Sequence, residues 1–171
     1  EDLLVKAKVF ALPGFRFSKY VSLRSPSMSI ISNNCWGGIS YNSLGMGFSS
    51  PFINMFIEDS QYLCLLRGLK DYLKLRLKFI RLDPAGGYPV CGLGDIELHC
   101  IHYSNMDDVE EKWYERVGRI NWDNLFIMMF TTNPQIVADF DQLDFEKKIC
   151  FVPFESSLKS AYYLQIVDRD E

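Results

Sequence analysis

Two carboxylates and both histidines of the chain fall within eight residues, in the stretch Asp-Ile-Glu-Leu-His-Cys-Ile-His at 95–102. Successive side chains of a strand point to opposite faces, so Asp95, Glu97 and His99 share one face and His102 lies on the other. His99 is the predicted general base, with Asp95 as a second candidate. The Asp-x-Glu spacing also resembles the acidic motif with which many glycosyltransferases hold a metal and a sugar diphosphate, although three residues assign no metal ligand. The alternative is a hydrogen-bonded polar edge without catalytic duty.

A second group of chemically useful residues follows the apolar pair Ile30-Ile31, in the run Ser-Asn-Asn-Cys-Trp-Gly-Gly at 32–38. Asparagines and paired glycines supply dihedral angles that other residues resist, so residues 33–38 are expected to form a loop. A loop at the end of an early strand is where open α/β sheets usually bind ligands. We therefore predict ligand contacts from a set of five residues: Asn33, Asn34, Trp36, Gly37 and Gly38.

Cys35 and Trp36 each allow two interpretations. A thiol in this loop, at a helix N-terminus, could have a lowered pKa and act as a nucleophile paired with His99 or His102. The alternative for Cys35 is a small buried side chain at the end of the strand. Trp36 is expected either to stack on a sugar or nucleobase or to pack as an aromatic of the core or its rim.

Basic residues recur at helical spacing further along the chain, where Lys112, Arg116 and Arg119 form one stripe. A diphosphate could dock on such a stripe, and we predict phosphate contacts from Arg116 and Arg119. Surface ion pairs are the alternative, because Asp108 lies four residues before Lys112 and Glu115 lies four before Arg119.

Three further polar residues are candidates for the same pocket. His102 is either a buried side chain satisfied by the backbone or a base or ligand. Tyr103 ends the predicted strand 95–103 and is assigned to the ligand-binding set. Asn121 either lines a pocket or caps a turn.

Apolar strands and amphipathic helices must position these residues. Strands are expected to end at Ser32 and to span 77–82, 88–91, 95–103, 125–130 and 148–152, with a further apolar element at 52–57. Helices are expected from a Ser60 cap to Leu73, from Asn105 to Ile120, and directly after Asn133-Pro134.

This order predicts a single α/β domain with a Rossmann-like, mixed but mainly parallel sheet flanked by helices. The close succession of strands between residues 77 and 103 adds a hairpin portion. Residues 1–26 are expected to form an N-terminal helix or arm, and residues 27–171 the α/β domain.

Composition narrows the class of protein. With 171 residues and 48% hydrophobic content, the chain should bury roughly two thirds of its unfolded surface. The net charge is −4; residues 1–26 carry five basic and two acidic side chains, +3, which leaves −7 on the remainder. An acidic body argues against a nucleic-acid partner. The basic leader allows at most weak peripheral contact with an anionic membrane.

Hydropathy and cysteine usage point to a compartment. No run approaches the ~18 to 20 apolar residues of a transmembrane helix, and the opening residues do not read as a signal peptide. The five cysteines form no CxxC pair, so we expect reduced thiols in a cytoplasmic protein. The oligomeric state and any cofactor are not predicted.

Several blocks of this chain resemble domain-of-unknown-function family 1919, often described as exopolysaccharide biosynthesis proteins. The blocks are Ser32 to Gly38, Leu44-Gly45, Ser50 to Asn54, Tyr88 to Val90, Gly94 to Ile96, His99 to Tyr103, Lys112-Trp113, Arg116 and Arg119 to Asn121. The resemblance spans roughly residues 27–130 and implies an α/β fold in a bacterial cell-surface polysaccharide context. It implies no reaction.

The first functional hypothesis is a group transferase acting on a sugar phosphate or nucleotide sugar. His99 or Asp95 would then be the base, Arg116 and Arg119 would hold phosphate, and Trp36 would pack on the sugar. It requires residues 33–38, the 95–103 strand and the basic stripe to meet around one hollow. The alternatives are a non-catalytic sugar- or nucleotide-binding accessory protein and a Cys35-dependent hydrolase or acyltransferase.

Overall fold

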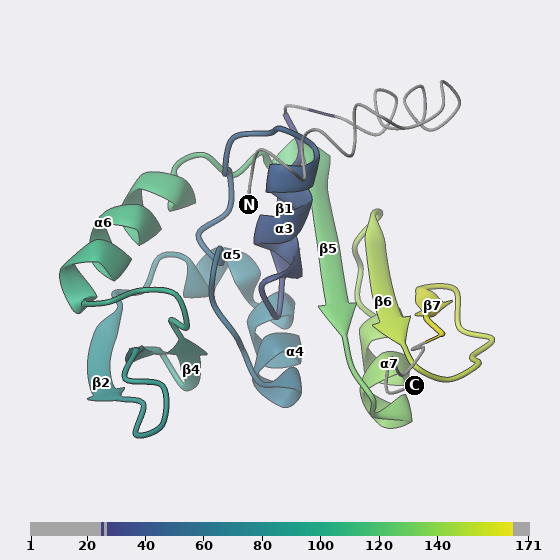
Figure 1. Cartoon of the computed structure of the whole chain (residues 1–171). Helices are drawn as coiled ribbons and strands as arrows, with labels where there is room; N and C mark the ends of the chain where they lie inside the picture. The colour runs from purple at the N-terminus through teal and green to yellow at the C-terminus, as the bar shows by residue number, and fades with distance from the viewer. Residues whose placement is uncertain (1–24, 26, 166–171) are drawn as a thin grey trace, which may run out of the picture.

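The computed structural model describes residue 25 and residues 27–165, in which helices pack around two separate β-sheets (Figure 1). The arm expected at residues 1–26 therefore lies almost wholly outside the described residues. Among the residues that are described, no helix has the length and apolar character needed to cross a membrane.

The larger sheet has four parallel strands in the order β1-β5-β6-β7. They are β1 (Ser29–Ser32), β5 (Leu125–Phe130), β6 (Lys148–Val152) and β7 (Ala161–Tyr163). The expected strands at 125–130 and 148–152 are confirmed, as is the strand end at Ser32. Strand β7 was not predicted, because its three residues are too few to form a recognisable alternation.

The smaller sheet is the predicted hairpin portion, with antiparallel strands in the order β2-β3-β4. They are β2 (Lys78–Leu82), β3 (Pro89–Leu93) and β4 (Ile96–His99). The mixed α/β class is confirmed, but the strands do not combine into one mixed sheet. Among the described residues β1 has a strand on one side only, so the Rossmann-like arrangement is not confirmed.

Six helical segments connect these strands: α3 (Trp36–Ser43), α4 (Asp59–Arg67), α5 (Leu69–Tyr72), α6 (Met106–Val117), η1 (Trp122–Asn124) and α7 (Pro134–Asp141). The predicted caps Asn105 and Asn133 are confirmed, since their side chains accept hydrogen bonds from the first turns of α6 and α7. Glu58, not Ser60, caps α4. Gly68 then separates α4 from α5 within the single helix that the sequence predicted.

The parallel sheet is covered on both faces. Strand residues Ile30 and Met128 pack with Tyr41 of α3 on one face. Their neighbours Ile31 and Ile127 pack on the other face with α4, α6 and α7, and Figure 1 shows α3 and α7 on opposite sides of the sheet. Beneath the sheet, the buried Tyr62 hydroxyl lies 3.0 Å from the carbonyl oxygens of both Ile31 and Met128.

The expected loop at residues 33–38 is wrong in its second half, because Gly37 and Gly38 lie in the first turn of α3. The glycines serve close packing rather than unusual dihedral angles. A Cβ atom on Gly37 would lie 2.6 Å from Ser32 Oγ, which itself accepts a hydrogen bond from Gly37 N at 3.0 Å. The glycine pair was therefore correctly interpreted as a structural requirement, but the requirement is close packing and not an unusual dihedral angle.

Two other expected elements are corrected. The strand predicted at 95–103 ends at His99, because the chain turns at residues 101–102. Alternation holds only within β4, where Ile96 and Leu98 are buried and Glu97 and His99 are half-buried. The apolar element at 52–57 is irregular and pairs with β4 through a single bridge between Phe56 and His99.

Candidate functional site

The carboxyl ends of β1 and β5 lie side by side, with Ser32 opposite Met128 in the register. The chain leaves β1 for α3 on one face of the sheet and leaves β5 for α7 on the other. Neighbouring parallel strands whose connections diverge in this way leave a crevice beyond their ends, where open α/β sheets bind ligands. We call this end of the sheet, where residues 33–36 and 131–133 follow the strands, the carboxyl edge.

Asn33 is the buried polar residue at the carboxyl edge. Its Nδ2 donates to Asp59 Oδ1 and to the Phe130 carbonyl, both at 3.1 Å, and its Oδ1 accepts from Phe130 N at 3.2 Å. Thr131 Oγ1 donates to the other Asp59 oxygen at 2.5 Å. Since Asn33 is only 1% exposed, its amide is fully used in joining β1, β5 and α4.

Asn34 and Cys35 lie one step further out. Asn34 Oδ1 accepts from Trp36 N at 2.9 Å, and its Nδ2 has no partner among the described residues. Cys35 occupies the N-cap position of α3 without a side-chain bond to the helix. The predicted helix N-terminus is therefore present, but burial raises the pKa of the Cys35 thiol, which opposes thiolate formation.

Asn54 also lies at the carboxyl edge, although sequence reasoning gave it no role. Its φ of 62° is the one left-handed value among the described non-glycine residues, a conformation that concentrates at binding and catalytic sites. A Cβ on Gly38 would lie 3.4 Å from Asn54 Oδ1, and Ile57 N donates to the Asn33 carbonyl at 2.8 Å. The segment 54–57 thus runs beside residues 33–38.

His99 reaches the same side of the molecule through Phe56. The two residues exchange backbone hydrogen bonds of 2.8 and 2.9 Å. The imidazole lies between the rings of Phe56 and Tyr88, at centroid distances of 5.8 and 6.1 Å. Its ring nitrogens have no hydrogen-bond partner among the described residues, so His99 keeps the freedom that a base requires.

The two carboxylates beside His99 are already engaged. Arg81 donates two hydrogen bonds to Glu97, at 3.0 and 2.8 Å, and this pairing lowers the pKa of Glu97. Tyr72 donates its hydroxyl to Asp95, which raises the pKa of that tyrosine. Within the described part of the chain, no three His, Cys, Asp or Glu side chains form a metal-binding group.

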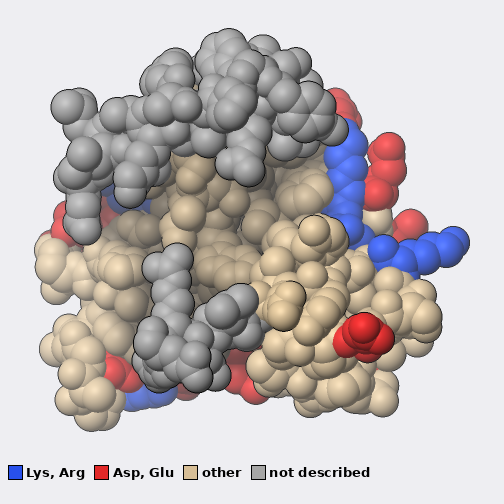
Figure 2. Space-filling view, turned by 45° about the vertical axis from the view of Figure 1, so that its right-hand side comes forward, with Lys and Arg blue, Asp and Glu red and all other residues tan. Residues whose placement is uncertain are grey.

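Trp36 begins a row of aromatic side chains across the end of the parallel sheet. Its indole packs on Phe130 at 5.4 Å and on Phe151 at 5.3 Å, and Phe151 packs edge-on against Tyr162 at 5.8 Å. Figure 2 brings the β6 and β7 side of the molecule forward, and its charged side chains gather towards the margins of the described surface. In this row, which we call the aromatic wall, Trp36, Phe130 and Phe151 are half-buried and Tyr162 is exposed.

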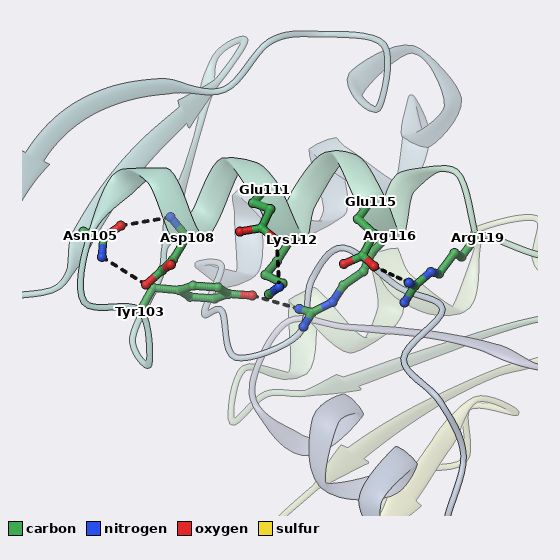
Figure 3. Close-up of polar contacts among 8 residues, drawn as sticks. All are labelled: Tyr103, Asn105, Asp108, Glu111, Lys112, Glu115, Arg116 and Arg119. Atoms are coloured by element: carbon green, nitrogen blue, oxygen red, sulfur yellow. Dashed lines mark hydrogen bonds and ion pairs between the residues drawn. The ribbon is translucent and has the colours of Figure 1, made fainter.

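The basic stripe of α6 lies elsewhere and is already partnered (Figure 3). Arg119 pairs with Glu115, as the alternative interpretation predicted, whereas Lys112 pairs with Glu111 at 3.2 Å rather than with Asp108. Arg116 is nine-tenths buried and donates to the Tyr103 hydroxyl at 2.9 Å, with its guanidinium 5.1 Å from the Phe48 ring.

The end of α6 meets the opposite end of the sheet, which we call the amino edge. Asn121 N donates to Ser29 Oγ and Asn121 Nδ2 to the Ser27 carbonyl, both at 2.8 Å, where β1 begins. Arg119 and Asn121 are therefore separated from residues 33–36 by the length of β1. The prediction that all candidate groups meet around one hollow is wrong, since these two lie beyond the far end of that strand.

His102 also departs from its expected place. It follows the end of β4 by three residues, lies in the turn at 101–102, and is exposed rather than buried on an apolar face. The neighbouring Tyr103 is half-buried and donates its hydroxyl to the Ile53 carbonyl at 3.1 Å. Alternation failed at His102 because the extended backbone ended before it.

With this geometry in place, comparison with known sequences gives the family. Residues 6–171 match the family model described as "Domain of unknown function (DUF1919)". The chain belongs to the DUF1919 family. An uncharacterised protein of Haemophilus influenzae is 36% identical over 148 residues, which cover 84% of this chain and 70% of that protein. The family resemblance inferred from the sequence blocks is confirmed and extends beyond them.

This DUF1919 chain also has a groove at the amino edge. Its volume is about 430 Å³, and a second cavity of about 400 Å³ adjoins it along shared residues such as Arg67 and Phe145. The walls carry both charge signs, and the exposed Trp122 ring lies 5.1 Å below Lys70 Nζ. Sequence reasoning did not identify this groove, because residues 66–71, 122–125 and 144–147 meet only through the fold.

Proposed function

We propose that this DUF1919 protein binds an activated sugar, either a sugar phosphate or a nucleotide sugar, at the carboxyl edge and transfers a group from it in the assembly of surface polysaccharide. The strongest support is that Asn34 Nδ2 and the Asn54 side-chain amide, which have no hydrogen-bond partner among the described residues, accompany the aromatic wall led by Trp36. Both flank the diverging ends of β1 and β5.

The chemistry of the crevice suits a sugar better than a highly charged ligand. Sugars present apolar C–H faces that pack on aromatic rings, together with hydroxyl groups that bond to amides. The aromatic wall led by Trp36 provides the first kind of contact, and Asn34 Nδ2 and the Asn54 amide provide the second. The family's frequent description as exopolysaccharide biosynthesis proteins is consistent with such a ligand.

In this proposal His99 is the general base. Its ring nitrogens are unengaged, and its backbone is joined to Phe56, two residues from Asn54. Asp95 is less suited to the role, because Tyr72 already donates a hydrogen bond to it. The basic residues of α6 contribute no phosphate contact here, since each has a partner within the protein.

A binding protein without catalytic activity is the second candidate. The engagement of Asp95 and Glu97 by Tyr72 and Arg81 favours it, because it leaves His99 as the single unengaged titratable group of that face. A Cys35-dependent hydrolase is less favoured, since burial raises the pKa of the thiol.

Thermal unfolding with a panel of nucleotide sugars and sugar phosphates, with and without Mg²⁺ or Mn²⁺, tests the proposal. A ligand present at 100 times its Kd stabilises the folded state by about 2.7 kcal/mol, which is a readily measured shift. We expect Trp36→Ala to abolish the shift. The matched control Trp122→Ala, at the amino-edge groove, should retain it.

The outcomes separate the candidates. A shift with turnover that His99→Gln abolishes supports the transferase, and a shift without turnover supports the accessory binding protein. Absence of a shift with every member of the panel, or a shift lost in Trp122→Ala but kept in Trp36→Ala, contradicts binding at the carboxyl edge.

A further inference from the structure

Helix α6 and the turn after it contact Phe48 and Phe52, in the segment that leads to Asn54. Trp113 packs edge-on against Phe52 with ring centroids 5.2 Å apart. Arg116 lies over the Phe48 ring, and Arg119 Nη1 donates to the Phe48 carbonyl at 3.4 Å. Trp113 and Arg116 lie three residues apart on one side of α6, and Arg119 lies in the turn directly after the helix.

A chain of hydrogen bonds continues from this face to Asn54. Arg116 Nη1 donates to the Tyr103 hydroxyl at 2.9 Å (Figure 3). That hydroxyl donates in turn to the Ile53 carbonyl at 3.1 Å. The Ile53 carbonyl and the Asn54 nitrogen belong to the same planar peptide unit. Fixing this carbonyl therefore fixes the plane from which the left-handed φ of Asn54 is measured.

The Arg116 and Tyr103 pair is poorly explained as simple packing. Arg116 is only 9% exposed, and it has no carboxylate partner among the described residues, so its burial is costly. Burial also raises the pKa of Tyr103, which keeps its hydroxyl protonated and able to donate to Ile53. A left-handed asparagine costs about 1 kcal/mol or more and needs surrounding structure to hold it.

We propose that Arg116 and Tyr103 are positioning residues, which hold Asn54 in its left-handed conformation and so aim its amide into the crevice at the carboxyl edge. The role assigned to the Asn54 amide rests on the proposed function. The control of its backbone does not, and it can be tested without a ligand.

The ligand-free test uses NMR of the full chain. A residue with φ near +60° gives an unusually strong nuclear Overhauser effect between its own amide and Hα protons. We expect this signal at Asn54 in the wild type and its marked weakening in Tyr103→Phe, which removes only the hydroxyl. Arg116→Lys, which keeps the charge and loses the fork geometry, should weaken it less. Tyr114→Phe, at an exposed position on the same helix, is the matched control.

The ligand test follows with whichever activated sugar binds the wild type. Tyr103→Phe should weaken binding about tenfold, the equivalent of one hydrogen bond, while melting falls by only a few degrees. An unchanged Asn54 signal in both Tyr103→Phe and Arg116→Lys overturns the positioning role, whatever binds. If no panel member binds, the proposed function fails, and the NMR result still decides the inference.

Discussion

The two ends of the parallel sheet use their polar groups differently. At the carboxyl edge, Asp59 accepts hydrogen bonds from Asn33 and Thr131, while Asn34 Nδ2 and the Asn54 amide have no partner among the described residues. At the amino edge, charges of both signs line a groove of about 430 Å³. The contrast teaches that cavity volume and ligand-directed polar groups need not coincide in this fold.

At the carboxyl edge, buried hydrogen bonds hold the backbone from which the outer side chains Asn34 and Asn54 project. The buried Asn33 amide fixes the ends of β1 and β5, and the Tyr62 hydroxyl supports both strands from beneath. Binding groups are more precisely placed when a layer of hydrogen bonds holds their backbone. No comparable layer of buried polar side chains joins the walls of the amino-edge groove among the described residues.

The largest effect in this comparison is expected from Asn33→Ala. It leaves Asp59 and the Phe130 backbone groups without their buried partner, so the free energy of unfolding should fall by about 3 kcal/mol. Asn121→Ala, the amino-edge counterpart, is half-exposed and should cost about 1 kcal/mol. Urea titrations that rank the two variants in the reverse order would break the comparison.

Gly37→Ala should have the next largest effect. The added Cβ meets Ser32 Oγ at 2.6 Å, inside the turn that joins β1 to α3, and overpacking of this kind costs about 2 kcal/mol. Gly38→Ala is the control, because its Cβ would meet Asn54 and Ile53 at 3.4 Å and alanine favours the helix. Thermal unfolding measures both; equal costs would show that α3 tolerates a shift away from Ser32.

The smallest effect concerns Glu97, on the face of β4 that carries His99. Arg81 lowers the pKa of Glu97, so the pair stabilises the folded state above the ordinary glutamate pKa of about 4.3, and this contribution is lost as the pH falls further. Because the pair is exposed, Glu97→Gln should cost at most about 0.5 kcal/mol at pH 7 and nothing near pH 3. Urea midpoints at the two pH values check this; a loss that persists at pH 3 would contradict it.

Local signals in the sequence were sufficient for most elements. The apolar runs at 125–130 and 148–152 predicted β5 and β6, and the asparagines at 105 and 133 predicted two helix starts. These features depend on neighbouring residues, which a sequence displays directly. The division into two sheets depends on long-range pairing, and spacing along the chain does not determine it.

For the same reason, only part of the candidate site could be predicted from the sequence. The composition of residues 33–38 was enough to predict a candidate site there. The need for glycine at position 37 was not predictable, because it depends on the close approach of Ser32 in the folded structure. Asn54 was not predicted as a site residue, because its left-handed backbone conformation is not marked by any local sequence pattern. Lys112 and Arg116 lie on α6 as predicted, whereas Arg119 lies in the turn after it, and the partners Phe48 and Tyr103 come from distant segments.

The most direct test is to locate a bound activated sugar by NMR. We predict that titration perturbs the side-chain amide signals of Asn34 and Asn54 and the indole N–H of Trp36, and leaves the indole N–H of Trp122 unchanged. Perturbation of the Trp122 signal with the other three unchanged would place the ligand in the amino-edge groove and contradict the account.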